Sequence, residues 1–176
     1  MKEIVSQILS QYFTKMREPK LEELEINEKY SNMTGCCFIT LYINGEVRGS
    51  AWNIKEIQAN IAWELLANTM QALTSDKRFP PLTLQESEKI QFRIDYISQR
   101  NMLNLKDISG CDPTKYWIIA INRNYEKLAV ILPNMSPKLM TWSDLLPVLE
   151  NKLADKKLDD KNYIFYKIET QVETNF

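Results

Sequence analysis

The sequence feature that most constrains the fold is an asparagine-glycine pair set between two stretches rich in β-branched and aromatic residues. Asn44-Gly45 follows the run from Cys36 to Ile43, and Glu46 to Trp52 forms the returning stretch. An Asn-Gly pair favours the positive backbone φ angles that a two-residue type I′ turn requires. The sequence therefore predicts an antiparallel β-hairpin over residues 36–52.

A predicted helix and a clear stop signal follow the hairpin. Apolar residues recur at helical spacing over residues 55–74, namely Ile57, Ile61, Leu65, Leu66, Met70 and Leu73. The next segment reads Asp76-Lys-Arg-Phe-Pro-Pro-Leu-Thr83. Proline lacks an amide donor and disfavours helical geometry in the residue before it, so the helix must end here. We expect this segment to pack back beside the hairpin.

The rest of the chain alternates between helical and strand periodicities. Helical patterns cover residues 4–16, a short stretch at 84–89, and a segment from Thr141 or Ser143 to about Lys156. Strand patterns cover residues 92–98, 116–122, 128–132 and 163–172, and the middle two are apolar enough to be central. Residues 18–34 and 99–114 are irregular, and we expect them to be connections.

This order of elements predicts the fold class. The succession α, ββ, α, β, ββ, α, β is typical of an α+β domain in which helices cover a mixed, largely antiparallel β-sheet. A chain of 176 residues that is 44% hydrophobic is long enough for one core and short for two independent ones. We therefore expect a single domain over residues 1–176.

Composition argues against several classes of protein. Twenty-two basic and 23 acidic residues give a net charge of -1, without the basic excess typical of small nucleic-acid-binding domains. Cys36, Cys37 and Cys111 lack Cys-x-x-Cys spacing, and adjacent strand residues point to opposite faces. We expect reduced thiols, no metal site and no cofactor. No apolar run approaches the ~20 residues that span a bilayer, so we expect a cytoplasmic protein.

The sequence contains no histidine. A Ser-His-Asp or Cys-His site, a histidine general base and most catalytic zinc sites all require imidazole. Within this chain, acid-base chemistry falls to Asp, Glu, Lys, Tyr or Cys.

The hairpin, the helix and the Asp76–Thr83 segment together resemble the AMMECR-type domain family. The matching residues run from Gly35 to Gly49 and from Asp76 to Thr83, and a looser likeness continues to the final strand. The resemblance implies an α+β fold with a larger and a smaller lobe separated by a cleft. It also implies a possible association with a Memo-like protein and a radical-SAM protein. It implies no established activity, because a fold does not determine a function.

This chain departs from the family pattern after the hairpin turn. The family typically reads Arg-Gly-Cys-Ile-Gly, whereas this chain has Arg48-Gly49-Ser50-Ala51-Trp52. If the family's cysteine is a nucleophile, Ser50 needs a strong neighbouring base, because a hydroxyl is far less acidic than a thiol. Trp52 places an indole where the family has a glycine, so a pocket there is narrowed or lined differently.

The candidate site residues come from these two segments. They are Arg48, Gly49, Ser50, Trp52, Asp76, Arg78, Phe79, Pro80 and Pro81, with Ser50 as a weak candidate nucleophile. Each has a structural alternative. Arg78 binds an anionic ligand, pairs with Asp76 or caps the preceding helix. The Phe-Pro-Pro segment forms a partner-binding surface or packs against the hairpin, and Arg48-Gly49 contact a ligand or serve turn geometry.

Three functions from different classes remain open. The first, which we favour, is a non-catalytic or degenerate module that binds a partner protein or small ligand in the cleft beside Arg48 and Arg78. The second is an enzyme or accessory protein in a Memo- and radical-SAM-linked modification pathway, with a concave site at these residues. The third is nucleic-acid binding through exposed aromatics such as Tyr42, Trp52 and Trp63.

Overall fold

The computed structural model describes residues 1–108, 110–112, 114–131, 133 and 142–176. They form two compact units: residues 1–97 with 171–176, and residues 98–170. The strand order of the sheet is β2-β1-β3-β6-β4-β5. Strands β3 (Ile90–Leu103) and β6 (Tyr163–Thr174) each run from one unit into the other.

The larger unit begins with helix α1 (Lys2–Lys15) and contains the predicted hairpin as β1 (Cys37–Ile43) and β2 (Glu46–Trp52). Asn44 and Gly45 have φ angles of 53° and 81°, as a type I′ turn requires. Strand β1 pairs antiparallel with β2 on one side and with β3 on the other. The predicted hairpin is therefore confirmed, and β1 is the inner strand of the three.

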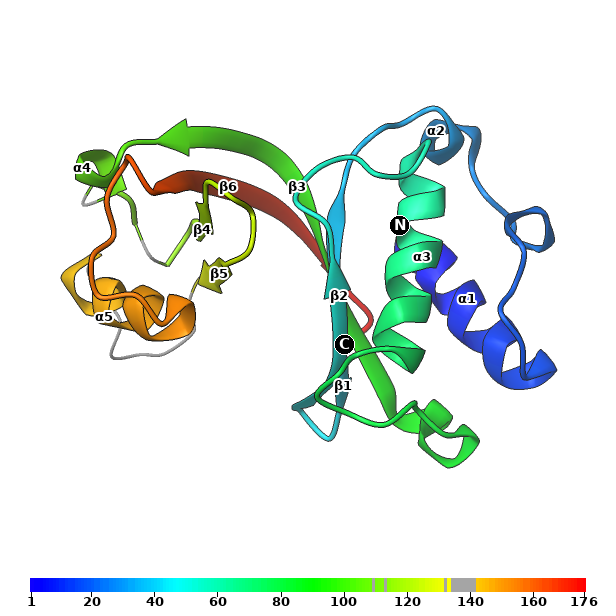
Figure 1. The fold of residues 1–176 in the computed structure, drawn as a ribbon. Helices are drawn as coiled ribbons and strands as arrows, with labels where there is room; N and C mark the ends of the chain where they lie inside the picture. The colour runs from blue at the N-terminus through cyan, green and yellow to red at the C-terminus, as the bar shows by residue number, and fades with distance from the viewer. Residues whose placement is uncertain (109, 113, 132, 134–141) are drawn as a thin grey trace. The chain divides into compact units, whose positions relative to one another are not determined.

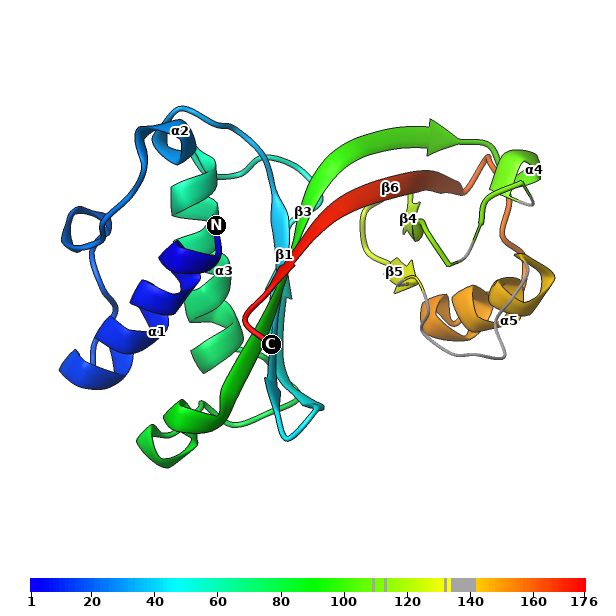
Figure 2. The same cartoon turned by 180° about the vertical axis from the view of Figure 1, so that it is seen from behind.

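Helix α3 (Ile61–Thr74) packs against β1, β2 and α1 (Figures 1 and 2). Neighbours on two sides explain why ten of its residues are buried. The helix begins six residues later than predicted. The Asn60 side chain accepts the backbone N–H of Trp63 and caps the start, and Ile57, predicted for the inner face, is 60% exposed in the preceding loop.

Short helices fill several segments of the larger unit. They are the 3-10 helix η1 (Leu21–Glu23), helix α2 (Glu28–Ser31) and the 3-10 helix η2 (Leu84–Lys89). Residues 18–34, predicted as irregular, thus contain two single turns. Asn27 caps α2 through a hydrogen bond from the Lys29 amide, a local cap that sequence periodicity does not register.

The smaller unit contains helix α4 (Leu105–Ile108), strands β4 (Trp117–Asn122) and β5 (Leu128–Ile131), and helix α5 (Trp142–Leu153). Strand β4 pairs antiparallel with β5 and β6, and five of its six residues are buried. Strand β5 lies at the edge of the sheet, so the prediction that both strands are central was right for β4 only. Thr141, one predicted cap of α5, lies outside the described residues.

Each unit has its own apolar cluster. The larger cluster includes Ile8, Ile39, Leu65 and Phe92, and the smaller includes Ile118 and Phe165 among others. The predicted α+β class, with helices on a largely antiparallel sheet, is confirmed. The single domain and the cleft stay predictions. None of the helices in the described ranges is long and apolar enough to cross a membrane.

Candidate functional site

The two segments singled out in the sequence meet in the larger unit, where β2 lies beside the Asp76–Thr83 segment. Six side chains make polar or ring contacts across this junction, and we call them the Arg48–Arg78 cluster: Arg48, Ser50, Asp76, Arg78, Phe79 and Glu86. Arg48 also donates to the carbonyls of Pro80 and Pro81. The Leu82 amide donates to the Leu73 carbonyl at 2.9 Å, so the segment turns back onto the end of α3. Helix α3 ends at Thr74, before the prolines, as predicted, and hydrogen bonds from Arg48 and Ser50 join the segment to β2 of the hairpin.

Asp76 is the acceptor at the centre of the cluster. Its Oδ2 accepts the Ser50 amide at 2.8 Å and Arg78 Nη2 at 2.6 Å, and its Oδ1 accepts Arg78 Nε at 3.0 Å. The hydrogen bonds from the Arg78 guanidinium hold the pKa of Asp76 well below its usual range, while burial opposes this shift. Asp76 is therefore ionised and a very weak base.

Ser50 faces a cation. Arg78 Nη2 donates to Ser50 Oγ at 2.6 Å, and the hydroxyl lies 3.5 Å from Asp76 Oδ2. A serine nucleophile needs a base that accepts its proton. The carboxylate beside Ser50 has a lowered pKa and already binds Arg78, so it is poorly suited to that role.

Arg48 also joins β2 to the Asp76–Thr83 segment. In the pairing of β1 with β2, Leu41 opposes Gly49 and Tyr42 opposes Val47, which leaves Arg48 as the extra residue of a β-bulge. Its guanidinium donates to the Pro80 carbonyl at 2.8 Å and forms a two-point ion pair with Glu86, at 2.7 and 3.3 Å.

Glu86 was missing from the predicted site. It accepts the Thr83 amide and hydroxyl, each at 2.8 Å, as well as Arg48. Burial acts to raise the pKa of Glu86, but these hydrogen bonds outweigh it and the pKa is lowered. The sequence signal was present, because Thr83-Leu-Gln-Glu86 is a capping-box pattern. No local sequence pattern indicates that Glu86 pairs with Arg48, which is 38 positions away.

Phe79 is close to two guanidinium groups. The Cζ atoms of Arg48 and Arg78 lie 5.9 and 5.2 Å from its ring centroid, within cation–π range. A groove of about 460 Å³, which we call the hairpin groove, opens beside this ring. It is lined by Ile43, Asn44, Glu46, Val47, Arg48 and Phe79.

Gly49 and Trp52, also predicted site residues, have structural surroundings. Gly49 is buried in the middle of β2, and a Cβ atom there would collide with the carbonyl oxygen of Ala72 in α3. The Trp52 ring stacks on Phe38, with centroids 5.2 Å apart. The close strand-helix approach accounts for the glycine. Turn geometry, one of the two roles considered for it, does not apply, because Gly49 lies within β2.

A buried polar cluster surrounds Glu64 of α3. Glu64 is 0% exposed, and its Oε1 accepts the side-chain amides of Asn53 at 2.6 Å and Asn68 at 2.9 Å. Its Oε2 has no hydrogen-bond partner among the described residues. Burial raises the pKa of Glu64. Glu64 was not among the residues predicted for the inner face of the helix, yet it is part of the interior.

The cysteines and aromatics of the other hypotheses have the following positions. Cys36 and Cys37 are both buried, and burial raises the pKa of Cys37. No group of three metal-ligating side chains was found in the described part of the chain. Of the aromatics proposed for nucleic-acid binding, Trp63 is 38% exposed, whereas Tyr42 and Trp52 are less exposed and contact Phe176 and Phe38.

Comparisons with known proteins identify the family and the fold. A family model described as AMMECR1 matches residues 2–171. A solved structure, the uncharacterized protein PH0010 from Pyrococcus horikoshii, superposes with a TM-score of 0.77 over 96% of this chain and 86% of that one. At 13% sequence identity this likeness concerns the fold alone.

Two curated relatives are similar over part of the chain. A Thermotoga maritima protein, described only as "Protein", is 32% identical over 110 residues, which is 62% of this chain and 60% of the relative. Protein CA_C1420 of Clostridium acetobutylicum is 27% identical over 129 residues, covering 72% of this chain and 26% of the relative. The chain thus matches less than two thirds of either relative, and neither description states an activity.

Proposed function

We propose that this chain, which belongs to the AMMECR1 family, is a binding module and that it recognises a partner protein or small ligand at the hairpin groove. The observation that supports this most is the hydrogen bonding of Ser50, the candidate nucleophile, and of Asp76 beside it. Ser50 accepts a hydrogen bond from Arg78, and the neighbouring Asp76 is saturated by donors. Such an arrangement favours rigid support of a surface over nucleophilic chemistry.

The groove offers the two kinds of contact that recognition needs. Phe79 and the 41% exposed Val47 provide apolar surface, and Arg48 in the lining provides positive charge. Arg78, with a side chain that is 59% exposed, adds a second cation beside the Phe79 ring. Hydrogen bonds from Arg48 to Pro80 and Glu86 hold the wall of the groove in place before any ligand arrives. A preorganised wall lowers the ordering cost of binding. The matching ligand has an apolar side chain next to a carboxylate.

The family resemblance suggests which partners to try first, a Memo-like protein and a radical-SAM protein. We expect one of them to bind this chain through the groove. The test is calorimetry with each purified candidate from the same genome. Val47→Asp places a charge in the groove without removing a buried contact, and it should weaken binding at least about tenfold.

Two comparisons make the experiment decisive. Tyr125→Ser, at an exposed position in the other unit, is the matched control and should leave the affinity unchanged. Equal affinities for the wild type and Val47→Asp would contradict binding at the groove. Turnover of a substrate by the purified chain that disappears in Ser50→Ala would overturn the proposal of a non-catalytic module.

A further inference from the structure

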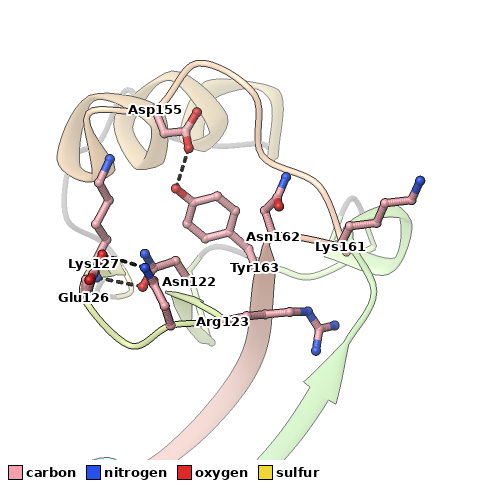
Figure 3. A pocket seen from close by; sticks show the side chains of 9 residues that line it. Asn122, Arg123, Glu126, Lys127, Asp155, Lys161, Asn162 and Tyr163 are labelled. Atoms are coloured by element: carbon pink, nitrogen blue, oxygen red, sulfur yellow. Dashed lines mark hydrogen bonds between the residues drawn. The ribbon is translucent and has the colours of Figure 1, made fainter.

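A polar pocket of about 440 Å³ lies in the smaller unit, at the end of the sheet where β4 turns into β5 (Figure 3). Its walls come from three places in the sequence: residues 122–124, 126 and 127 at the turn, Asp155 after α5, and residues 161–163 at the start of β6. The volume lies within the ~300–1,000 Å³ range of small-molecule sites. This pocket is separate from the hairpin groove and from every residue singled out in the sequence.

Hydrogen bonds hold the walls of the pocket in position. Tyr163 donates its hydroxyl to Asp155 Oδ2 at 2.7 Å, as the dashed line in Figure 3 marks. Burial, together with this carboxylate, raises the pKa of Tyr163 to about 12, so the tyrosine stays a donor at neutral pH. The turn is tied by the Lys127 amide, which donates to Asn122 Oδ1 at 2.7 Å.

Three cations line the pocket: Arg123, Lys127 and Lys161. None of them forms a salt bridge with a carboxylate of the described residues. In Figure 3, Lys127 lies on one side of Tyr163, and Arg123 and Lys161 lie on the other. Arg123 donates through Nη2 to the Asp160 carbonyl at 2.8 Å, which orients its guanidinium and leaves other N–H groups available.

The two acidic residues of the lining are already bound by neutral donors. Asp155 accepts Tyr163 and the Lys157 amide, and Glu126 accepts the Asn124 side-chain amide at 2.5 Å. Both acids keep their negative charge, and the charge of Lys127 contributes to the lowered pKa of Asp155, so the lining carries three positive and two negative groups. A pocket whose cations outnumber its acids, and whose cations form no salt bridge within the described residues, is suited to an oxyanion.

The turn that lines the pocket also contains a strained residue. Tyr125 has a φ of 61°, in the left-handed region that a bulky residue rarely adopts, and it is 74% exposed. Its neighbours Asn124 and Glu126 both line the pocket. Such strain persists where the surrounding structure requires it, and it clusters at ligand sites. The backbone strain at Tyr125 is thus a second observation, independent of the charges that line the pocket.

From the pocket, its unpaired cations and its fixed walls, we infer that this site binds a phosphate group. The source is either free inorganic phosphate or the phosphate of a small phosphorylated molecule. Arg123 and Lys161, which lie on the same side of Tyr163, are the residues that contact its oxygens, and Lys127 adds positive charge from the other side. Two-point binding by Arg123 and point charges from the lysines are the usual way in which proteins hold phosphate.

The experiment is an NMR titration of the full chain labelled with ¹⁵N. Inorganic phosphate, AMP and citrate are added separately at constant ionic strength. We expect phosphate or AMP to shift the amide signals of residues 122–127 and 161–163 with saturation, and the tighter of the two identifies the source. Citrate is also an oxyanion, so citrate binding as tight as the better phosphate compound would overturn the assignment to phosphate.

Charge-removing variants test the residues. Arg123→Gln, Lys127→Gln and Lys161→Gln should each weaken binding by about tenfold, the usual effect of losing a hydrogen bond to a charged group. Lys115→Gln removes the same charge from an exposed position of the same unit outside the pocket, and it should leave the affinity unchanged. Equal losses in Lys115→Gln and the pocket variants, or no saturable shift in the wild type, would contradict the inference. Val47→Asp should not affect this titration, which separates it from the test of the hairpin groove.

Discussion

Gly49 of β2 lies directly against the backbone of Ala72 in α3, with no room between them for a side chain. The contact positions β2, the strand in which Arg48 and Ser50 flank Gly49. Adding one methyl group therefore requires the helix or the strand to move, because the atom in its way is a backbone carbonyl.

We expect Gly49→Ala to lower the free energy of unfolding by about 2 kcal/mol, within the range for an overpacked interior. Gly110→Ala is the control, since the nearest atom to its added Cβ lies 3.6 Å away, an ordinary contact distance. That variant should be neutral within about 0.5 kcal/mol. Urea unfolding followed by circular dichroism measures both, and equal stabilities for the two variants would contradict the close approach.

Asp76→Asn tests the centre of the Arg48–Arg78 cluster. The pKa of Asp76 is lowered in the folded state, so its ionised form stabilises the fold above its ordinary value of 3.8. That stability should be lost as the pH falls below this value. The variant should be less stable by about 1 kcal/mol at neutral pH, with allowance for the solvent screening of the exposed Arg78.

The measurement for Asp76 is the free energy of unfolding from pH 2.5 to pH 7. The gap between the curves of the wild type and Asp76→Asn should begin to narrow below pH 3.8. It should close only as the pH falls through the lower folded-state pKa, where protonation removes the same charge that the substitution removes. Curves that stay parallel over the whole range would show that the Asp76 carboxylate does not have the lowered pKa.

Glu64→Gln tests a group whose pKa is shifted in the other direction. Burial raises the pKa of Glu64, so between 4.5 and the folded-state pKa the folded chain holds a proton that the unfolded chain has lost. The wild type should therefore lose stability as the pH rises through the folded-state pKa. Glutamine cannot ionise and keeps the oxygen that accepts from Asn53 and Asn68.

We expect Glu64→Gln to be more stable than the wild type at pH 8, by on the order of 1 kcal/mol, the scale of an unsatisfied buried acceptor. The advantage should shrink as the pH approaches 4.5. Thermal unfolding at several pH values measures it. An advantage that grows toward acidic pH would have the wrong sign and would contradict a buried, protonated Glu64.

The ion pair between Arg48 and Glu86 can be measured by a double-mutant cycle. Both side chains are largely shielded from solvent, with 17% and 26% of their surface exposed, and the pair has two-point geometry. We expect a coupling energy of about 1 kcal/mol between Arg48→Met and Glu86→Gln. Arg123→Gln, in the other unit, should show additive effects with Glu86→Gln. A coupling near zero in the first cycle would mean that the ion pair does not secure the segment to β2.

Some parts of this structure follow from residues that are close in sequence. Asn44-Gly45 specifies its turn because both residues tolerate positive φ, and Thr83 with Glu86 forms a cap within four residues. The helix start illustrates the limit. Ile57 continues the apolar spacing of α3, yet Asn60 caps the helix after it, and periodicity alone does not weigh a cap against one more apolar residue.

The sequence by itself determined the hairpin, the helix stop at the prolines, the α+β class and the family, because each depends on local backbone preferences or on a matching order of residues. Only the tertiary structure decided the pairing of Arg48 with Glu86, the contact of Gly49 with Ala72 and the burial of Glu64. The pocket of Arg123, Lys127 and Lys161 is of the same kind, since its residues come from separate segments. Contacts between distant positions depend on how folded elements pack, which local preferences do not encode.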